Sequence, residues 1–242
     1  MNRKIKKLKK INIYADGADE KTILEMNKNK LITGFTTNPT LMRKSGVRDY
    51  EKFSKKILNK VKKKPISFEV FSDDLNEMKE QALKISSWGQ NIFVKIPIMN
   101  TQKKYTYKLI KQLTDLNIKL NITAIMTEVQ AIKAIESIQN NTETIISIFA
   151  GRIADTQRDP LPILNNIIKF KNTNKLNNVK ILWASPREIL NLQQAREIGC
   201  DIITLTDTLI DKIKYTNYNL NKFSLDTVKM FYLDAKKSKF KI

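Results

Sequence analysis

Residues 92–97 read Ile92-Phe93-Val94-Lys95-Ile96-Pro97, a run in which only Lys95 is polar. Apolar side chains at consecutive positions are typical of a strand covered on both faces, as in a parallel sheet packed between helices. Similar β-rich runs recur at a steady interval on either side of this one. Together they predict eight strands, near residues 11–15, 31–35, 66–71, 92–96, 120–125, 145–149, 180–184 and 201–205.

The stretches between these runs have the spacing of helices. Apolar residues recur every three or four positions in four groups: Ile57/Leu58/Val61, Leu75/Met78/Ala82/Ile85, Leu109/Leu113/Leu116 and Ile132/Ile135/Ile138. We expect helices to begin at Asp19, Thr101, Thr127 and the Ser185-Pro186 pair, and one helix to end at Gly199. Eight such βα units predict the α/β class and, within it, a closed (β/α)8 TIM barrel.

An open, doubly wound sheet is the alternative architecture. It is disfavoured because the chain has only 6 glycines and no glycine-rich phosphate loop. Since there is no internal repeat and no linker, residues 1–242 are predicted to form a single domain. Its ends are a basic N-terminal segment at residues 1–10 and a C-terminal helix and basic tail at about residues 217–242.

The composition excludes several kinds of catalysis. The 242 residues include no histidine and one cysteine, Cys200. The chain therefore has no Ser-His-Asp triad, no Cys-His dyad, no HExxH zinc site and no internal disulfide or cysteine-based metal cluster. Acid–base chemistry must use carboxylates, lysines, hydroxyls or bound water.

The charge is strongly positive, with 44 Lys+Arg against 24 Asp+Glu, a formal net charge of +20. Basic runs at residues 4–10 and 60–64 raise the alternative of a nucleic-acid-binding surface. Only 7 of the 44 cations are arginine, the residue expected where phosphates or bases are bound bidentately. We therefore expect a solvated basic surface that attracts anionic substrates, and no nucleic-acid partner.

A membrane partner is not expected either. The basic N-terminus is followed by a short apolar run that ends at Asp16, unlike the apolar region of a signal peptide. No stretch of about 18 apolar residues occurs. A cytoplasmic location is the prediction.

Polar residues gather where the predicted strands end, which is where (β/α)8 barrels carry their active sites. Asn121 and Thr123 are two residues apart and share one face of a strand, as do Ser67 and Glu69. The polar groups should converge on one mouth of the barrel. The candidate residues are Asp16, Thr36, Asn38, Glu69, Lys95, Asn121, Thr123, Phe149, Arg152, Ser185 and Arg187.

Lys95 is the strongest of these candidates, because a lysine inside a buried strand loses hydration. Burial disfavours the ammonium and lowers the pKa, which favours an amine nucleophile for Schiff-base catalysis. Asp16 and Glu69 could move the protons through a water. Three alternatives stay open: Lys95 extends to solvent, Glu69 is an ion-pair partner that keeps it charged, or Asp16 belongs only to a turn.

Arg152 and Arg187 follow the sixth and seventh predicted strands. Guanidinium groups suit phosphate oxygens, and the late strands of such barrels often bind phosphate. The alternative is that both are ordinary surface arginines.

Seven motifs resemble those of the transaldolases, class I Schiff-base enzymes on a circularly permuted (β/α)8 barrel. They appear in family order across roughly residues 11–215. The motifs are Ile13-Tyr14-Ala15-Asp16, Gly34-Phe35-Thr36-Thr37-Asn38-Pro39-Thr40, Ser67-Phe68-Glu69-Val70, Val94-Lys95-Ile96-Pro97, Asn121-Ile122-Thr123, Phe149-Ala150-Gly151-Arg152-Ile153 and Ala184-Ser185.

The resemblance implies a role for ten of the eleven candidate residues. Lys95 would form the Schiff base, Asp16 would be the acid–base group for carbon–carbon cleavage, and Glu69 and Thr123 would hold the catalytic water. Further residues would bind the donor hydroxyls (Asn38, Asn121 and Ser185, supported by Thr36) and the phosphate (Arg152 and Arg187). No metal or organic cofactor is expected; sugar phosphates are the expected partners, and a homo-oligomer is left open.

The resemblance further implies transfer of a dihydroxyacetone unit from a ketose phosphate to an aldose phosphate, as in the pentose phosphate pathway. Glu69 and Phe149 match the transferases, whereas fructose-6-phosphate aldolases carry Gln and Tyr there. Ala154-Asp155-Thr156 departs from the usual continuation of the arginine motif. The alternatives are an aldolase, a specialised sugar-biosynthetic relative, or a basic barrel that binds nucleic acid with vestigial catalysis.

Overall fold

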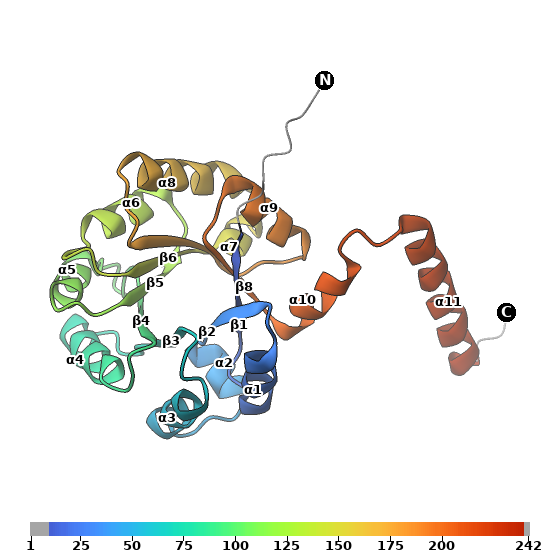
Figure 1. The fold of residues 1–242 in the computed structure, drawn as a ribbon, viewed down its shortest axis with the longest axis horizontal. Helices are drawn as coiled ribbons and strands as arrows, with labels where there is room; N and C mark the ends of the chain where they lie inside the picture. Colours follow the sequence, from blue (N-terminus) through green and yellow to red (C-terminus); the bar gives the residue numbers. More distant parts are fainter. Residues whose placement is uncertain (1–9, 240–242) are drawn as a thin grey trace.

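The structure, a computed structural model, describes residues 10–239 and contains a closed barrel of parallel strands (Figure 1). Neighbouring strands pair in chain order, and β8 pairs with β1 to close the ring. The strands are β1 (Asn12–Asp16), β2 (Ile32–Thr36), β3 (Ile66–Glu69), β4 (Ile92–Pro97), β5 (Leu120–Ile125), β6 (Thr144–Ile148), β7 (Val179–Trp183) and β8 (Ile202–Leu205).

Most of the helices surround the barrel and cover the outer face of its strands, whereas the last helix lies apart from it (Figure 1). The helices are α1 (Glu20–Lys28), α2 (Pro39–Lys44), α3 (Tyr50–Lys60), α4 (Leu75–Ser86), α5 (Tyr107–Asp115), α6 (Glu128–Glu136), α7 (Ala150–Ala154), α8 (Leu161–Thr173), α9 (Leu190–Ile198), α10 (Asp207–Asp211), the 3₁₀ helix η1 (Lys212–Tyr215) and α11 (Leu220–Ser238).

The prediction of a (β/α)8 barrel is confirmed, and each predicted strand lies within two residues of an observed one. The open-sheet alternative is wrong, because β1 pairs with both β2 and β8 and therefore has no free edge. The predicted C-terminal helix is α11. The basic N-terminal segment, apart from Lys10, lies outside the described residues, as does the end of the basic tail.

Three of the predicted helix boundaries are confirmed. Asp19 accepts a hydrogen bond from the backbone N–H of Thr22 and caps α1. Thr127 begins α6 with a capping box. Gly199 ends α9 in the left-handed conformation, with φ of 86°, which glycine adopts at little cost.

Two predicted helix starts are wrong. Thr101 lies in a loop closed by an antiparallel bridge between Met99 and Tyr105, so α5 begins only at Tyr107. The Ser185-Pro186 pair precedes α9 by several residues, because Ser185 has a φ of 58° and turns the chain before the helix starts at Leu190.

The inside of the barrel holds its own layer of buried side chains, Tyr14, Phe93, Ile145, Leu182, Ala184 and Ile202. Tyr14 is paired in register with Gly34 on the neighbouring strand. A Cβ added at Gly34 would lie 2.5 Å from a ring carbon of Tyr14. Gly34 therefore makes room for the tyrosine ring inside the barrel.

Replacing Gly34 by alanine should lower the free energy of unfolding by about 1–3 kcal/mol, because the new methyl group overpacks the barrel interior. In a Tyr14→Leu background the same change should cost less, since the ring that it meets is gone. Urea unfolding of the two single variants and the double variant measures this coupling. An equal cost in both backgrounds would refute the packing argument.

The C-terminal helix α11 differs from the other helices. Figure 1 shows it apart from the barrel, beyond α10 and η1, and none of its residues is buried. Within residues 10–239, no helix combines the length and the apolar character needed to cross a membrane.

Candidate active site

A cavity of about 650 Å³ opens at the C-terminal ends of the strands. All eleven candidate residues line it, so the predicted convergence of polar groups on one mouth is what the structure shows. They are Asp16, Thr36, Asn38, Glu69, Lys95, Asn121, Thr123, Phe149, Arg152, Ser185 and Arg187.

Lys95 is buried in β4, and its ammonium is held by two oxygen atoms. Its Nζ lies 3.1 Å from Oε2 of Glu69 and donates a hydrogen bond of 3.0 Å to the carbonyl oxygen of Thr37. Glu69 is its register partner on β3. Of the alternatives left open by the sequence, the ion pair is present, and extension of Lys95 to solvent is not.

Asp16 ends β1 beside its register partner Thr36, whose hydroxyl donates a hydrogen bond of 2.8 Å to its carboxylate. Burial raises the pKa of Asp16 above its ordinary value, although the charge of Lys95 and the Thr36 hydrogen bond oppose this shift. A carboxyl group with a raised pKa in a cavity is suited to taking and returning a proton.

Asn121 on β5 lies at the centre of a buried hydrogen-bond chain. Its Nδ2 donates to Oγ of Ser67 at 2.9 Å, and its Oδ1 accepts from Oγ of Ser147 at 2.6 Å. The two serines thereby fix the orientation of the amide. Beside it, the buried Oγ1 of Thr123 has no hydrogen-bond partner among residues 10–239, so it could bind a water.

The two arginines approach the cavity from adjacent connections. Arg152 lies in α7, after β6, and Arg187 follows β7. Gly151 allows this approach, because an added Cβ would lie 1.6 Å from the carbonyl oxygen of Ser185. The guanidinium groups and the Lys95–Glu69 pair thus face one cavity.

Five other polar residues also line the cavity and were not among the candidates, namely Thr40, Lys44, Ser147, Thr204 and Thr206. Ser147 carried a usable signal, because it is the only polar residue in the predicted run 145–149, as Lys95 is the only polar residue in its own run. Lys44 ends α2 and carried no such signal among the 44 cations of the chain.

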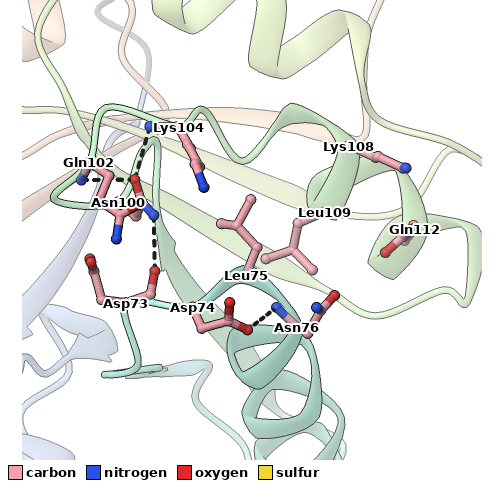
Figure 2. A pocket seen from close by; sticks show the side chains of 10 residues that line it. All are labelled: Asp73, Asp74, Leu75, Asn76, Asn100, Gln102, Lys104, Lys108, Leu109 and Gln112. Carbon is pink, nitrogen blue, oxygen red and sulfur yellow. Dashed lines mark hydrogen bonds between the residues drawn. The ribbon is translucent and has the colours of Figure 1, made fainter.

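A second pocket, of about 450 Å³, lies between the connections that follow β3 and β4 (Figure 2). Its two carboxylates already serve the local structure. Asp73 accepts bonds from the backbone N–H and hydroxyl of Thr101, and Asp74 caps α4 by accepting from the N–H of Asn76. No candidate residue lines this pocket, so the first cavity is the site.

Residues 13–242 match the family model described as Transaldolase/Fructose-6-phosphate aldolase. This chain belongs to the transaldolase/fructose-6-phosphate aldolase family. A relative from Thermoplasma volcanium named "Probable transaldolase" is 33% identical, over 91% of this chain and 96% of its own length. One of the same name from Nitrosopumilus maritimus is 30% identical, over 89% of this chain and 92% of its own length.

Solved structures support the fold alone. A flavocytochrome b2 mutant with benzoylformate aligns with a TM-score of 0.58 at 12% identity, over 81% of this chain and 56% of that chain. A structure described as native KDPGal aligns with a TM-score of 0.53 at 12% identity, over 85% of both chains. The chain is therefore a transaldolase-family enzyme on a TIM barrel, as the motifs implied.

Proposed function

We propose that the chain is a transaldolase, which transfers a dihydroxyacetone unit from a ketose phosphate to an aldose phosphate through a Schiff base on Lys95. The observation that carries the proposal is the buried Lys95 amine, which lies 3.1 Å from Glu69 in a cavity that it shares with Asp16. This cavity combines a nucleophile with two carboxylates, one of them with a raised pKa.

The reaction begins when the free amine of Lys95 attacks the ketone carbon of the donor. Glu69 is placed to take the ammonium proton. A water held by Glu69 and by the Thr123 hydroxyl, which has no hydrogen-bond partner within the described part of the chain, carries protons to the carbinolamine oxygen, which leaves as water. The resulting protonated imine is the electron sink for the next step, so the scheme uses no cofactor.

Carbon–carbon cleavage follows at Asp16. Its carboxylate takes the proton of the hydroxyl group on the far side of the scissile bond, the bond breaks, and the aldose phosphate leaves. A three-carbon enamine stays on Lys95 and adds to the carbonyl carbon of a second aldehyde, whose oxygen receives the proton back from Asp16. Asn38, Asn121 and Ser185 hold the donor hydroxyls, with Thr36 and Phe149 completing the wall.

Sugar phosphates are the proposed substrates. Arg152 and Arg187 line the cavity and present guanidinium groups to the phosphate. A chain of net charge +20 also raises the local concentration of anions. Nucleic-acid binding with vestigial catalysis is not favoured, because the cavity contains every residue that the proposed chemistry uses.

Transferase and aldolase are distinguished by the fate of the enamine. Glu69 and Phe149 favour the transferase, and the proposed test is borohydride trapping with fructose 6-phosphate, with and without erythrose 4-phosphate, followed by peptide mass mapping. A three-carbon adduct on Lys95 that the acceptor discharges into a seven-carbon product supports the proposal. Free dihydroxyacetone as the main product would instead identify an aldolase.

A cytoplasmic location, a single domain and a place in the pentose phosphate pathway stay predictions.

A homo-oligomer is also proposed, because α11 exposes apolar side chains along its length. These are Leu220, Phe223, Leu225, Val228, Met230, Phe231, Tyr232 and Leu233. A helix without a buried face gains little stability in water, and an exposed apolar surface of this kind marks an interface. The barrel has a groove of about 420 Å³ in which Met42, Val47, Tyr50 and Phe71 lie beside Arg43 and Arg48, and a second copy of the chain is the occupant that we propose.

Replacing Val228 and Phe231 together by serine should therefore convert the oligomer into a monomer, because it removes two apolar side chains from the contact without adding a charge that Arg43 and Arg48 could pair with. Light scattering coupled to size-exclusion chromatography measures the mass. The matched control replaces Lys222 and Lys229, on the same helix, by serine. A wild-type protein that is already monomeric at high concentration would refute the proposal.

A further inference from the structure

Asp155 makes a two-pronged ion pair with one of the cavity arginines. It follows α7, and its Oδ1 accepts a hydrogen bond of 2.9 Å from Nε of Arg187, while its Oδ2 accepts from Nη2 of the same guanidinium. These contacts with Arg187 lower the pKa of Asp155, and the nearby charge of Arg152 adds to the effect. The carboxylate is therefore ionised at neutral pH, and it binds one edge of the guanidinium, formed by Nε and Nη2.

Asp155 contacts the Arg187 guanidinium from one particular side. Arg152 and Arg187 both line the cavity that contains Lys95, whereas Asp155 does not. The carboxylate thus holds the guanidinium from outside the cavity. A guanidinium presents five N–H donors, and an ion pair through Nε and Nη2 leaves the donors of Nη1 and the second one of Nη2 for another anion.

The backbone on both sides of the ion pair is also held. The N–H of Arg187 donates a hydrogen bond of 2.8 Å to Oδ1 of Asn191. On the other side, the close contact of Gly151 with Ser185 sets the position of α7. With its main chain fixed, the long side chain of Arg187 is the remaining flexible part, and Asp155 is the group that orients it.

We propose that Asp155 is a positioning residue, which holds the guanidinium of Arg187 ready for the phosphate of the substrate. The inference deepens the proposed function and rests on its assignment of Arg187 to the phosphate. An arginine that is already ordered loses less conformational freedom on binding, which improves affinity.

A purely electrostatic role for Asp155 predicts the opposite effect. Removing a negative charge beside an anion site should strengthen anion binding, so without positioning an alanine variant would bind phosphate more tightly. Both side chains are about half exposed, and water and salt screen charges there over roughly 8 Å at physiological ionic strength. The sign of the change in affinity therefore separates positioning from simple repulsion.

The experiment measures the dissociation constant of inorganic phosphate by phosphorus NMR titration of the full-length protein. Asp155→Ala should weaken phosphate binding by about five- to tenfold. Asp155→Asn, which keeps one acceptor oxygen for the guanidinium, should fall between this variant and the wild type. Glu143→Gln is the control, because it removes an equal charge from the exposed pair with Lys119 at the opposite end of the barrel, and it should change nothing.

A second readout excludes general damage to the fold. Trapping of unphosphorylated dihydroxyacetone on Lys95 should stay within about twofold of the wild type in both Asp155 variants, whereas KM for a phosphorylated donor should rise. Unchanged or tighter phosphate binding in Asp155→Ala would overturn the inference. Arg187→Ala tests the underlying assignment separately: if it leaves phosphate affinity unchanged, the phosphate site of the proposed function is wrong, whatever Asp155 does.

Discussion

Replacing Lys95 by methionine is expected to abolish borohydride trapping and to lower turnover by at least about ten-thousand-fold, because no other group supplies the covalent intermediate. Lys95→Arg should be equally inactive. The guanidinium keeps the positive charge beside Glu69 but does not form an imine. Mass mapping of the trapped peptide and steady-state turnover of fructose 6-phosphate with erythrose 4-phosphate measure the two losses.

A second lysine offers a control for these variants. Lys64 is partly buried, burial lowers its pKa, and it donates hydrogen bonds to the carbonyl oxygens of Asn27 and Asn29 away from the cavity. Lys64→Met should therefore trap substrate and turn over at close to the wild-type rate. Trapping that persists in Lys95→Met, or that is lost in Lys64→Met, would rule out the assignment of Lys95.

The second large effect is expected at Asp16. Asp16→Asn should lower turnover by about a hundred- to ten-thousand-fold, since the amide cannot take the hydroxyl proton during cleavage. Trapping of dihydroxyacetone on Lys95 should persist, because imine formation precedes the step that needs Asp16. An Asp16→Asn variant with near-normal turnover would refute the acid–base role.

The raised pKa of Asp16 also predicts how pH acts on activity and stability. The carboxylate is the active base, so turnover should fall as the pH drops through the raised pKa, which lies above the ordinary value of 3.8. For stability the sign is reversed. The folded state holds this proton more tightly than the unfolded chain, so the contribution of Asp16 to stability declines as the pH rises from about 3.8 through the raised pKa.

Asp16→Asn should therefore be less active but more stable than the wild type at neutral pH. Urea unfolding at neutral pH and at a pH below the raised pKa measures the difference, which should shrink at the lower pH. The control is Asp19→Asn, because Asp19 is exposed and caps α1 outside the cavity. If the stability of Asp16→Asn does not exceed that of the wild type at neutral pH, desolvation is not what raises the pKa.

Much of the site could be predicted from two patterns, the polar residues at the ends of strands and the pairs two residues apart that share one face of a strand. Lys95 is a single charge in an apolar strand, and Asn121 and Thr123 share a face, so placement at one mouth followed from the barrel prediction. Ser147 was missed although it carries the same kind of signal. The false helix start at Thr101 arose because a capping residue alone does not reveal a loop closed by Met99 and Tyr105.

Local sequence patterns were enough to predict the order of strands and helices, the class of fold and the set of polar residues at the strand ends. These properties depend on the spacing of apolar and polar residues within short segments, because that spacing indicates whether a segment is a helix or a strand and which of its faces is buried. The motifs, which are equally local, also implied the family.

Tertiary structure alone decided which of these residues touch. Three such contacts join positions up to 190 residues apart. They are the pairing of β8 with β1, the register that places Glu69 beside Lys95, and the ion pair between Asp155 and Arg187. Such contacts depend on strand register, burial and the path of the connections, which no short segment encodes. The position of α11 is also a tertiary property, because the sequence predicts a helix there but does not predict that it lies apart from the barrel (Figure 1).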